Sequence, residues 1–279
     1  MRRIEIKTKG LSNHIFSGEY QTAFKGRGMS FSEVREYNYG DDVRNIDWNV
    51  TARFSQPYVK VFEEERELIL MLMVDISASS LFGTQKQQKR ELITEICATL
   101  AFSALSNNDK VGVIFFSDKV EGFIPPKKGK SHILYIIREL LTKKSHAGAG
   151  TEIESALRYL NNVIKKKSIA FILSDFMSTE FEQSLQIAKK RHDIIGVQVY
   201  DPRDKNLPDI GLVQVQDSEN NDQLWLDTSS IEVRRAYEER FLNHKQKTEA
   251  SFLKSGADLL QINTGEDFVK PLMGFFKGR

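Results

Sequence analysis

The sequence predicts an α/β protein with a doubly wound, mostly parallel sheet and a β-rich N-terminal extension. From about residue 68 onward, short apolar runs alternate with amphipathic segments. These segments are long enough to be helical crossovers, which join parallel strands and cover both faces of a sheet. The earlier part of the chain lacks this alternation. We therefore expect an extension over residues 1–65 and an α/β domain over residues 66–279.

The predicted elements of the domain follow one another with short connections. Strands are expected where short apolar runs occur, at 68–74, 110–116, 168–174, 193–200 and 257–263. Helices are expected where apolar residues recur at helical spacing, at about 87–106, 130–142, 152–165 and 180–191. Residues 120–126 are expected to pair with the preceding strand as a hairpin and to stop at two prolines, Pro125 and Pro126.

The C-terminal third departs from this alternation. Residues 201–229 predict a loop and then a hairpin around residues 218–222, inserted before a long helix. That helix is expected to open with a capping box from Ser229 to Glu232 and to stop at Gly256. A short helix is expected to end the chain.

The N-terminal extension is rich in aromatic and charged side chains and has short strand-like pieces. Residues 45–54 show no helical period, so we expect a β-rich segment packed on the main domain. Two interpretations of its charges remain open: ion pairs that lock the extension in place, or a surface that binds a partner. The residues concerned are 25–28, Arg35, Asp41, Asp42, Arg44, Asp47, Trp48 and Arg53.

Composition excludes several classes of function. The 279 residues include 40 basic and 38 acidic ones, a net charge of +2, which gives no case for nucleic-acid binding. The single cysteine, Cys97, excludes an intramolecular disulfide and a cysteine-based metal site. No apolar stretch follows the basic N-terminus or approaches the length of about 18 residues typical of a membrane helix. We expect no signal peptide, no membrane insertion and a cytoplasmic location.

Oxygen-bearing side chains gather at the predicted ends of two strands. Asp75, Ser77 and Ser79 follow the first strand at alternate positions, so their side chains point to the same side. Asp175 follows the strand at 168–174, and Thr151 opens a helix between them. Ligands of open parallel sheets bind at the carboxyl ends of the strands. The sequence therefore predicts one site made from three loops.

This donor set suits a hard divalent cation. Mg²⁺ (or Mn²⁺) prefers oxygen ligands, and a cation relieves the repulsion between two neighbouring carboxylates. Thr151 has a competing interpretation, because Thr151 and Glu154 together form a capping-box pattern. Ser80 fits no ligand spacing and is expected to be a turn or cap residue.

The pattern Asp75-x-Ser77-x-Ser79, with Thr151 and Asp175, resembles the metal-ion-dependent adhesion site of von Willebrand factor A domains. In that family these residues surround Mg²⁺ directly or through water, and a partner's carboxylate completes the shell. Residues 17–67 look like the signature of the domain-of-unknown-function fifty-eight family, which joins such a segment to a von Willebrand factor A-like domain. Members of that family are commonly associated with MoxR-type AAA+ ATPases.

The resemblance implies a Mg²⁺-dependent adaptor rather than an enzyme. A partner protein would donate an Asp or Glu to the metal, and a MoxR-type AAA+ ATPase would be the expected partner in assembly or remodelling of protein complexes. Two alternatives stay open. One is a Mg²⁺-dependent phosphohydrolase, for which the sequence offers no clear general base. The other is a structural protein with a vestigial metal site.

Overall fold

The chain divides into two compact units in the computed structural model. One unit comprises residues 24–67, and the other includes residues 68–279. The structure describes residues 30–63, 68–83, 87–143, 150–178, 181–216 and 223–279. Within these ranges no helix is long and apolar enough to cross a membrane.

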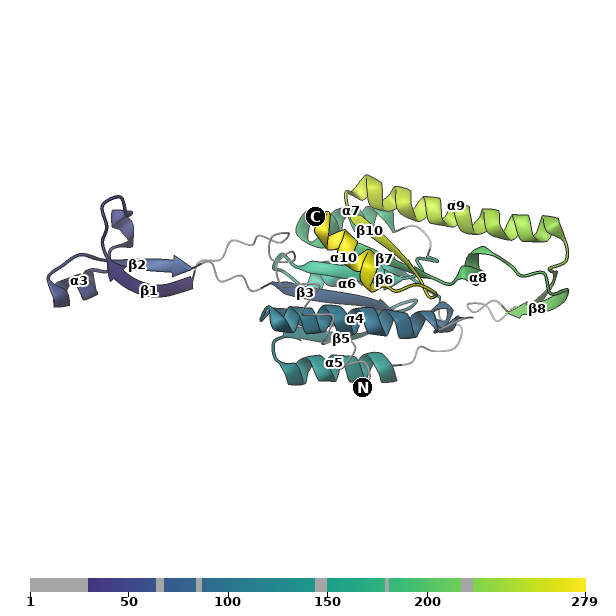
Figure 1. Ribbon diagram of the computed structural model, residues 1–279, viewed down its shortest axis with the longest axis horizontal. Coiled ribbons are helices and arrows are strands. Elements are labelled where there is room, and N and C mark those ends of the chain that lie inside the picture. Colours follow the sequence, from purple (N-terminus) through teal and green to yellow (C-terminus); the bar gives the residue numbers. More distant parts are fainter. Residues whose placement is uncertain (1–29, 64–67, 84–86, 144–149, 179–180, 217–222) are drawn as a thin grey trace. The chain divides into compact units, whose positions relative to one another are not determined.

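The larger unit is built on a six-stranded sheet in the order β10-β7-β6-β3-β4-β5 (Figure 1). The strands are β3 (Ile69–Asp75), β4 (Lys110–Phe116), β5 (Val120–Lys127), β6 (Ile169–Ser174), β7 (Asp193–Tyr200) and β10 (Asp258–Asn263). Each neighbouring pair is parallel except β4 and β5, which form an antiparallel hairpin at the edge. The predicted doubly wound, mostly parallel sheet is confirmed, including its hairpin strand.

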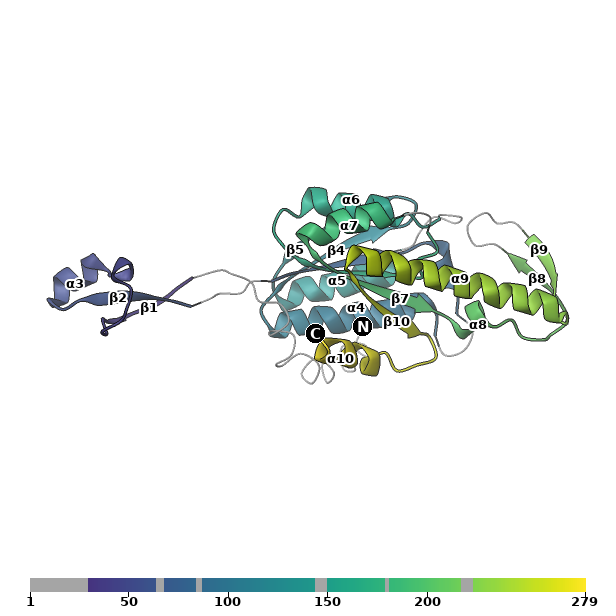
Figure 2. The ribbon, with the colours of Figure 1, turned by 90° about the horizontal axis from the view of Figure 1, so that it is seen from above.

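Helices cover both faces of this sheet. They are α4 (Lys89–Ser106), α5 (Lys130–Thr142), α6 (Ile153–Val163), α7 (Glu182–Arg191), α8 (Pro202–Lys205), α9 (Ile231–Ser255) and α10 (Val269–Lys277). Helices α6, α7 and α9 lie on one face, with α4 and α5 on the other (Figures 1 and 2). The Phe276 ring of α10 packs 6.2 Å from the Phe171 ring. Since strand side chains alternate between faces, α10 lies opposite α6, which covers Ala170 and Ile172.

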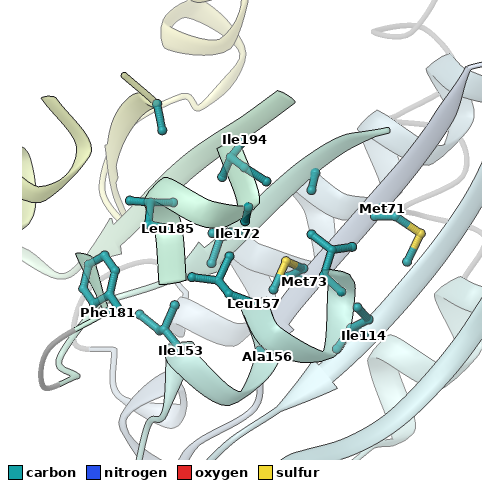
Figure 3. Close-up of a cluster of buried hydrophobic side chains, with 14 of the residues drawn as sticks. Met71, Met73, Ile114, Ile153, Ala156, Leu157, Ile172, Phe181, Leu185 and Ile194 are labelled. Atoms are coloured by element: carbon teal, nitrogen blue, oxygen red, sulfur yellow. The ribbon is translucent and has the colours of Figure 1, made fainter. Parts of the chain in front are cut away.

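The hydrophobic core on the α6 face fixes the sheet beneath the site. Fully buried Met71 and Met73 of β3 pack with Ile172 of β6 and with Leu157 of α6 (Figure 3). Phe252 of α9 joins the same cluster. Burial of these side chains on adjacent strands holds the ends of β3 and β6 in register.

The insertion after β7 is a hairpin, as predicted. Strands β8 (Leu212–Gln216) and β9 (Gln223–Asp227) pair antiparallel, while the predicted turn at 218–222 lies outside the described residues. Helix α9 ends at Gly256, whose φ of 67° is the left-handed conformation that glycine adopts readily. The expected cap at Ser229 is wrong, because Ser230 is the N-cap and its hydroxyl accepts from the Val233 amide.

The smaller unit is a two-stranded hairpin that carries short helices in its connection. Strands β1 (Ser30–Glu36) and β2 (Tyr58–Glu63) pair antiparallel, with a 3₁₀ turn η1 (Val43–Asn45) and helix α3 (Trp48–Phe54) between them. The expectation of no helix over 45–54 is wrong. Helix α3 has only seven residues, too few to show a period, and starts where the Asp47 carboxylate accepts from the Asn49 and Val50 amides.

Ion pairs of the described residues fold the connection between β1 and β2. The Arg35 guanidinium donates hydrogen bonds to both carboxylate oxygens of Asp41, at 2.8 and 2.7 Å, across the turn that follows β1. This bidentate pairing lowers the pKa of Asp41. Arg44 pairs in the same way with Asp42. These contacts fold the connection; residues 25–28, which belong to the same predicted network, lie outside the described residues.

Candidate metal centre at the carboxyl edge of the sheet

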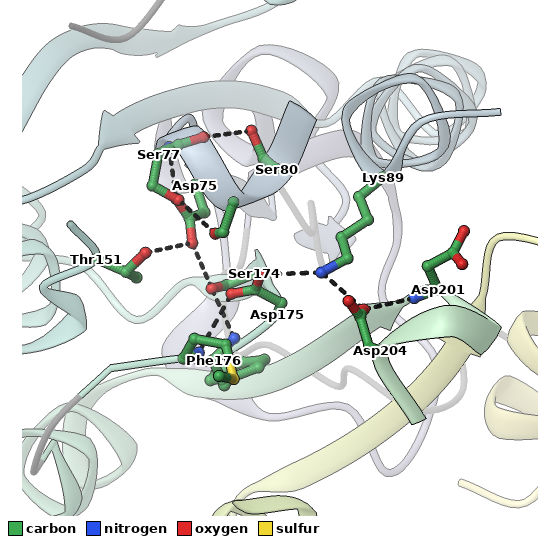
Figure 4. Close-up of polar contacts among 12 residues, drawn as sticks. Asp75, Ser77, Ser80, Lys89, Thr151, Ser174, Asp175, Phe176, Asp201 and Asp204 are labelled. Atoms are coloured by element: carbon green, nitrogen blue, oxygen red, sulfur yellow. Dashed lines mark hydrogen bonds and ion pairs between the residues drawn. The ribbon is translucent and has the colours of Figure 1, made fainter. Parts of the chain in front are cut away.

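The site lies where strands β3 and β6 end side by side. These strands are parallel, and their register places Val74 opposite Leu173. The next residues, Asp75 and Ser174, therefore emerge together at the carboxyl edge (Figure 4). Both residues are buried, with exposed fractions of 2% and 0%. A carboxylate is thus held at the end of the apolar sheet, where only hydrogen bonds or a cation can compensate its charge.

One backbone amide and two side-chain hydroxyls donate hydrogen bonds to the Asp75 carboxylate. Its Oδ1 accepts from the Ser77 amide at 2.8 Å. Its Oδ2 accepts from the Ser174 hydroxyl at 2.5 Å and from the Thr151 hydroxyl at 3.4 Å. The Ser77 hydroxyl in turn lies 3.0 Å from that of Ser79. Four of the five predicted ligands, Asp75, Ser77, Ser79 and Thr151, are thereby connected.

The charge of Asp75 is unfavourable in this setting. Burial, and secondly the charge of nearby Asp175, raise its pKa to about 6, against the opposing effect of the Ser174 and Ser77 hydrogen bonds. Among the described residues, Asp75 has no ion-pair partner. A divalent cation would remove this penalty.

Ser80 is a turn residue, as predicted. Its hydroxyl donates to the Ser77 carbonyl at 2.7 Å and closes the 3₁₀ turn η2 (Ala78–Leu81). The turn brings Ser79 back toward Ser77, which is how a short polar loop can present two hydroxyls together.

Thr151 does not cap helix α6. The N-cap of this helix is Glu152, and no side chain caps its first turn, so the capping-box interpretation of Thr151 and Glu154 is wrong. Instead the Thr151 hydroxyl points to Asp75 (Figure 4). The Glu152 amide donates to the Ser117 carbonyl at 2.7 Å and fixes the approach of this loop to the sheet edge.

The fifth predicted ligand, Asp175, has a cationic partner. Its Oδ2 lies 3.2 Å from the ammonium of Lys89, which also lies 2.8 Å from Oδ2 of Asp204 on α8. The Lys89 side chain is only 5% exposed. Burial opposes its charge, but the two carboxylates outweigh that effect and raise its pKa, so Lys89 is an ammonium ion in the folded protein.

Phe176 holds the backbone that follows Asp175 in an unusual conformation. Its φ is 59°, which is costly for a residue with a bulky side chain. Its amide donates to the Ser174 hydroxyl at 2.9 Å, and its fully buried ring packs edge-on against Phe252 at 5.3 Å. Aromatic packing from α9 thus fixes the turn that aims Asp175.

Sequence reasoning missed three residues of this site: Ser174, Lys89 and Asp204. Ser174 had a signal, since it is the last residue of a predicted strand and directly precedes Asp175. Lys89 and Asp204 had none, because a lysine at a helix start is usually solvated and its partner Asp175 is 86 residues away.

The donors fit a hard cation such as Mg²⁺. Among the described residues, no group of three or more His, Cys, Asp or Glu side chains could hold a metal. A cation here would rest on hydroxyl oxygens and on two aspartates, Asp75 and Asp175, which is oxygen chemistry of the kind Mg²⁺ accepts. The buried charge of Asp75, which has no ion-pair partner within the described ranges, is the structural feature that favours this fit.

The sheet order and this edge define the class: an α/β protein with a six-stranded, mostly parallel sheet and a carboxylate–hydroxyl cluster at its carboxyl edge. The chain belongs to the family described as Protein of unknown function DUF58, which matches residues 33–247.

Similar proteins have been recorded in several bacteria. The uncharacterized protein Rv1480 of Mycobacterium tuberculosis is 29% identical over 283 residues, covering 100% of this chain and 88% of that protein. Among solved structures, the conserved hypothetical protein BatB from Bacteroides thetaiotaomicron aligns with a TM-score of 0.48 and 16% identity, covering 76% of this chain and 98% of that one. The SpRpn10 VWA domain aligns with a TM-score of 0.41 and 10% identity over 75% and 95% of the two chains.

Proposed function

We propose that this chain is a non-enzymatic adaptor that binds a partner protein through Mg²⁺ (or Mn²⁺) at the carboxyl edge. Asp75, Ser77, Ser79, Thr151 and Asp175 would hold the ion, and an Asp or Glu of the partner would complete its shell. The observation that carries the proposal is the buried Asp75 carboxylate, which faces three hydroxyl-bearing side chains and has no cation among the described residues.

Family resemblance points to a MoxR-type AAA+ ATPase as the partner. Such an ATPase would supply the energy for assembly or remodelling, and this chain would supply recognition. A cytoplasmic location is part of the same proposal.

Pull-down of the MoxR-type ATPase of the source organism, with purified proteins, tests the proposal. We expect capture in the presence of Mg²⁺ and its loss with EDTA or with Asp75→Asn, which removes the charge but keeps the shape of the side chain. Glu239→Gln, an exposed position on α9, is the matched control and should leave capture unchanged. Equal capture by the wild-type chain with Mg²⁺ and with EDTA would rule out metal-gated binding.

A vestigial site is the second candidate, because the Lys89 ammonium already neutralises part of the charge around Asp175. In that case neither Mg²⁺ nor Mn²⁺ would bind at millimolar concentration. Isothermal titration calorimetry with each metal separates the two candidates.

A further inference from the structure

A buried lysine occupies the cationic position beside the candidate metal centre. Lys89 is the first residue of α4, and its amide donates to the Phe82 carbonyl at 3.0 Å. Its side chain reaches inward instead of into solvent, and its ammonium lies between Asp175 and Asp204 (Figure 4). Lysine is rarely buried unless it is paired, so this position is determined by the two carboxylates.

Each carboxylate that pairs with Lys89 also accepts a hydrogen bond from a backbone amide. The Asp175 Oδ1 accepts from the Met177 amide at 3.2 Å, which leaves Oδ2 for the ammonium. The Asp204 Oδ2 also accepts from the Asp201 amide at 2.8 Å, in the capping box of α8. The ammonium and these two amides together orient the carboxylates of Asp175 and Asp204.

The two aspartates at this edge differ in their charge partners. Lys89 pairs with Asp175 and Asp204, whereas Asp75 has no ion-pair partner among the residues that the structure describes. A divalent ion bound by Asp75 would approach Asp175 as well and would meet the positive charge of Lys89 there. Two cations would then compete for one carboxylate in a buried setting, where their repulsion is poorly screened.

We propose that Lys89 is an internal cation that holds Asp175 in place without metal and weakens Mg²⁺ binding by competing for that carboxylate. The inference rests on the proposed metal centre and concerns its regulation. Asp204 anchors the ammonium on the side away from Asp75, and so limits the competition. The positive charge of Lys89 opposes Mg²⁺ binding, and a carboxylate from the partner protein would offset that charge. Mg²⁺ and the partner would therefore each raise the affinity of the chain for the other.

Calorimetry with Mg²⁺ on the full, metal-free chain tests this role. Lys89→Met removes the charge and keeps most of the length of the side chain. We expect this variant to have a Mg²⁺ dissociation constant about tenfold lower than that of wild type. The matched control is Lys190→Met, an exposed lysine near the end of α7. That end of α7 leads into the start of β7, at the sheet edge opposite Asp75, so the dissociation constant should stay within about twofold of wild type.

Two further measurements keep the test decisive if Lys89→Met folds poorly. In thermal unfolding, Mg²⁺ should raise the Tm of Lys89→Met more than that of wild type, because the metal replaces the missing cation. Asp204→Asn removes one of the two carboxylates that pair with Lys89, so the ammonium would pair with Asp175 alone. Mg²⁺ should therefore bind this variant several-fold more weakly than wild type. An unchanged dissociation constant in Asp204→Asn, or an equal Mg²⁺-induced rise in Tm for Lys89→Met and wild type, contradicts the role of Lys89.

The outcomes separate this inference from the proposed function. Suppose that wild type binds Mg²⁺, that Asp75→Asn does not, and that Lys89→Met binds it with the same affinity as wild type. In that case only the competition by Lys89 is wrong. Should neither wild type nor Lys89→Met bind Mg²⁺, the metal centre itself is wrong, and the inference fails with it.

Discussion

The hydroxyl of Ser174 donates to Oδ2 of Asp75 across 2.5 Å and so joins the ends of β6 and β3. The same Ser174 oxygen accepts from the Phe176 amide at 2.9 Å. One buried hydroxyl thus organises both the carboxylate at the end of β3 and the turn after β6.

Removal of this hydroxyl should destabilise the fold. A hydrogen bond to a charged group contributes about 1.5–3 kcal/mol, so we expect Ser174→Ala to lower the free energy of unfolding by that amount. Urea denaturation at neutral pH provides the measurement. Ser106→Ala, which removes a bond to a backbone carbonyl at the end of α4, should change stability far less. Equal losses of unfolding free energy in the two variants would show that the Ser174 hydrogen bond contributes no more to stability than an ordinary helix-end bond.

Replacement of Thr151 separates metal binding from folding. Thr151→Val keeps the shape but removes the hydroxyl that faces Asp75. Because Thr151 caps no helix, the free energy of unfolding should change by less than about 1 kcal/mol without metal. Mg²⁺ binding measured by calorimetry should nevertheless weaken, while Thr151→Ser should bind as wild type does. A large loss of stability without metal would instead indicate a structural role.

Acid should destabilise the larger unit through His192. This residue is 1% exposed, and its Nδ1 lies 2.9 Å from the Ser168 hydroxyl. Its Nε2 has no hydrogen-bond partner among the residues that the structure describes. Burial, and secondly the charge of Arg191, lower its pKa from 6.5 to about 4. Between these two pH values His192 is protonated in the unfolded chain but neutral in the folded chain. Stability therefore falls as the pH drops through this window, by up to about 1.4 kcal/mol per pH unit.

Denaturation of wild type and His192→Asn between pH 7 and 4.5 measures this contribution. Asparagine has an oxygen for the Ser168 hydroxyl but does not titrate, so the variant should lose stability less steeply as the pH falls. Parallel pH profiles would assign the acid sensitivity to other groups.

Two glycines should respond oppositely to an added methyl group. At Gly196 of β7, a Cβ would meet the Phe252 ring and would lie 2.9 Å from Cδ1 of Leu259. Gly196→Ala should therefore destabilise the protein by about 1–3 kcal/mol. At Gly274 in α10 a Cβ would meet nothing within 4 Å, so Gly274→Ala should stabilise by about 0.5–1 kcal/mol through helix propensity. Thermal unfolding distinguishes the two, and the same sign for both would contradict the packing of α9 on β7.

The sheet could be predicted from sequence because its strands are buried on both faces. The run 68–74 and the run 168–174 are almost wholly apolar, and the structure places β3 and β6 there with differences of one residue. The position of the site followed, since parallel strands bring their carboxyl ends to one edge. Helix α3 could not be predicted, because seven residues with an aspartate cap carry no periodic signal.

The charges of the site were harder to predict than its oxygens. Asp75, Ser77 and Ser79 are neighbours in sequence, and their alternate spacing is visible there. The Lys89 ion pairs depend on how α4 and α8 approach the sheet edge, which is a matter of tertiary packing. Likewise, the orientation of Thr151 toward Asp75 instead of toward the start of α6 depends on where the Glu152 amide is bound.

The two prolines of β5 bear on self-association. This strand forms one outer edge of the sheet, and neither Pro125 nor Pro126 has an amide hydrogen to offer to a further strand. Two copies of the chain therefore cannot join their sheets through a regular ladder along this part of β5. This part of the edge is therefore protected against the strand-to-strand growth that leads to fibrils.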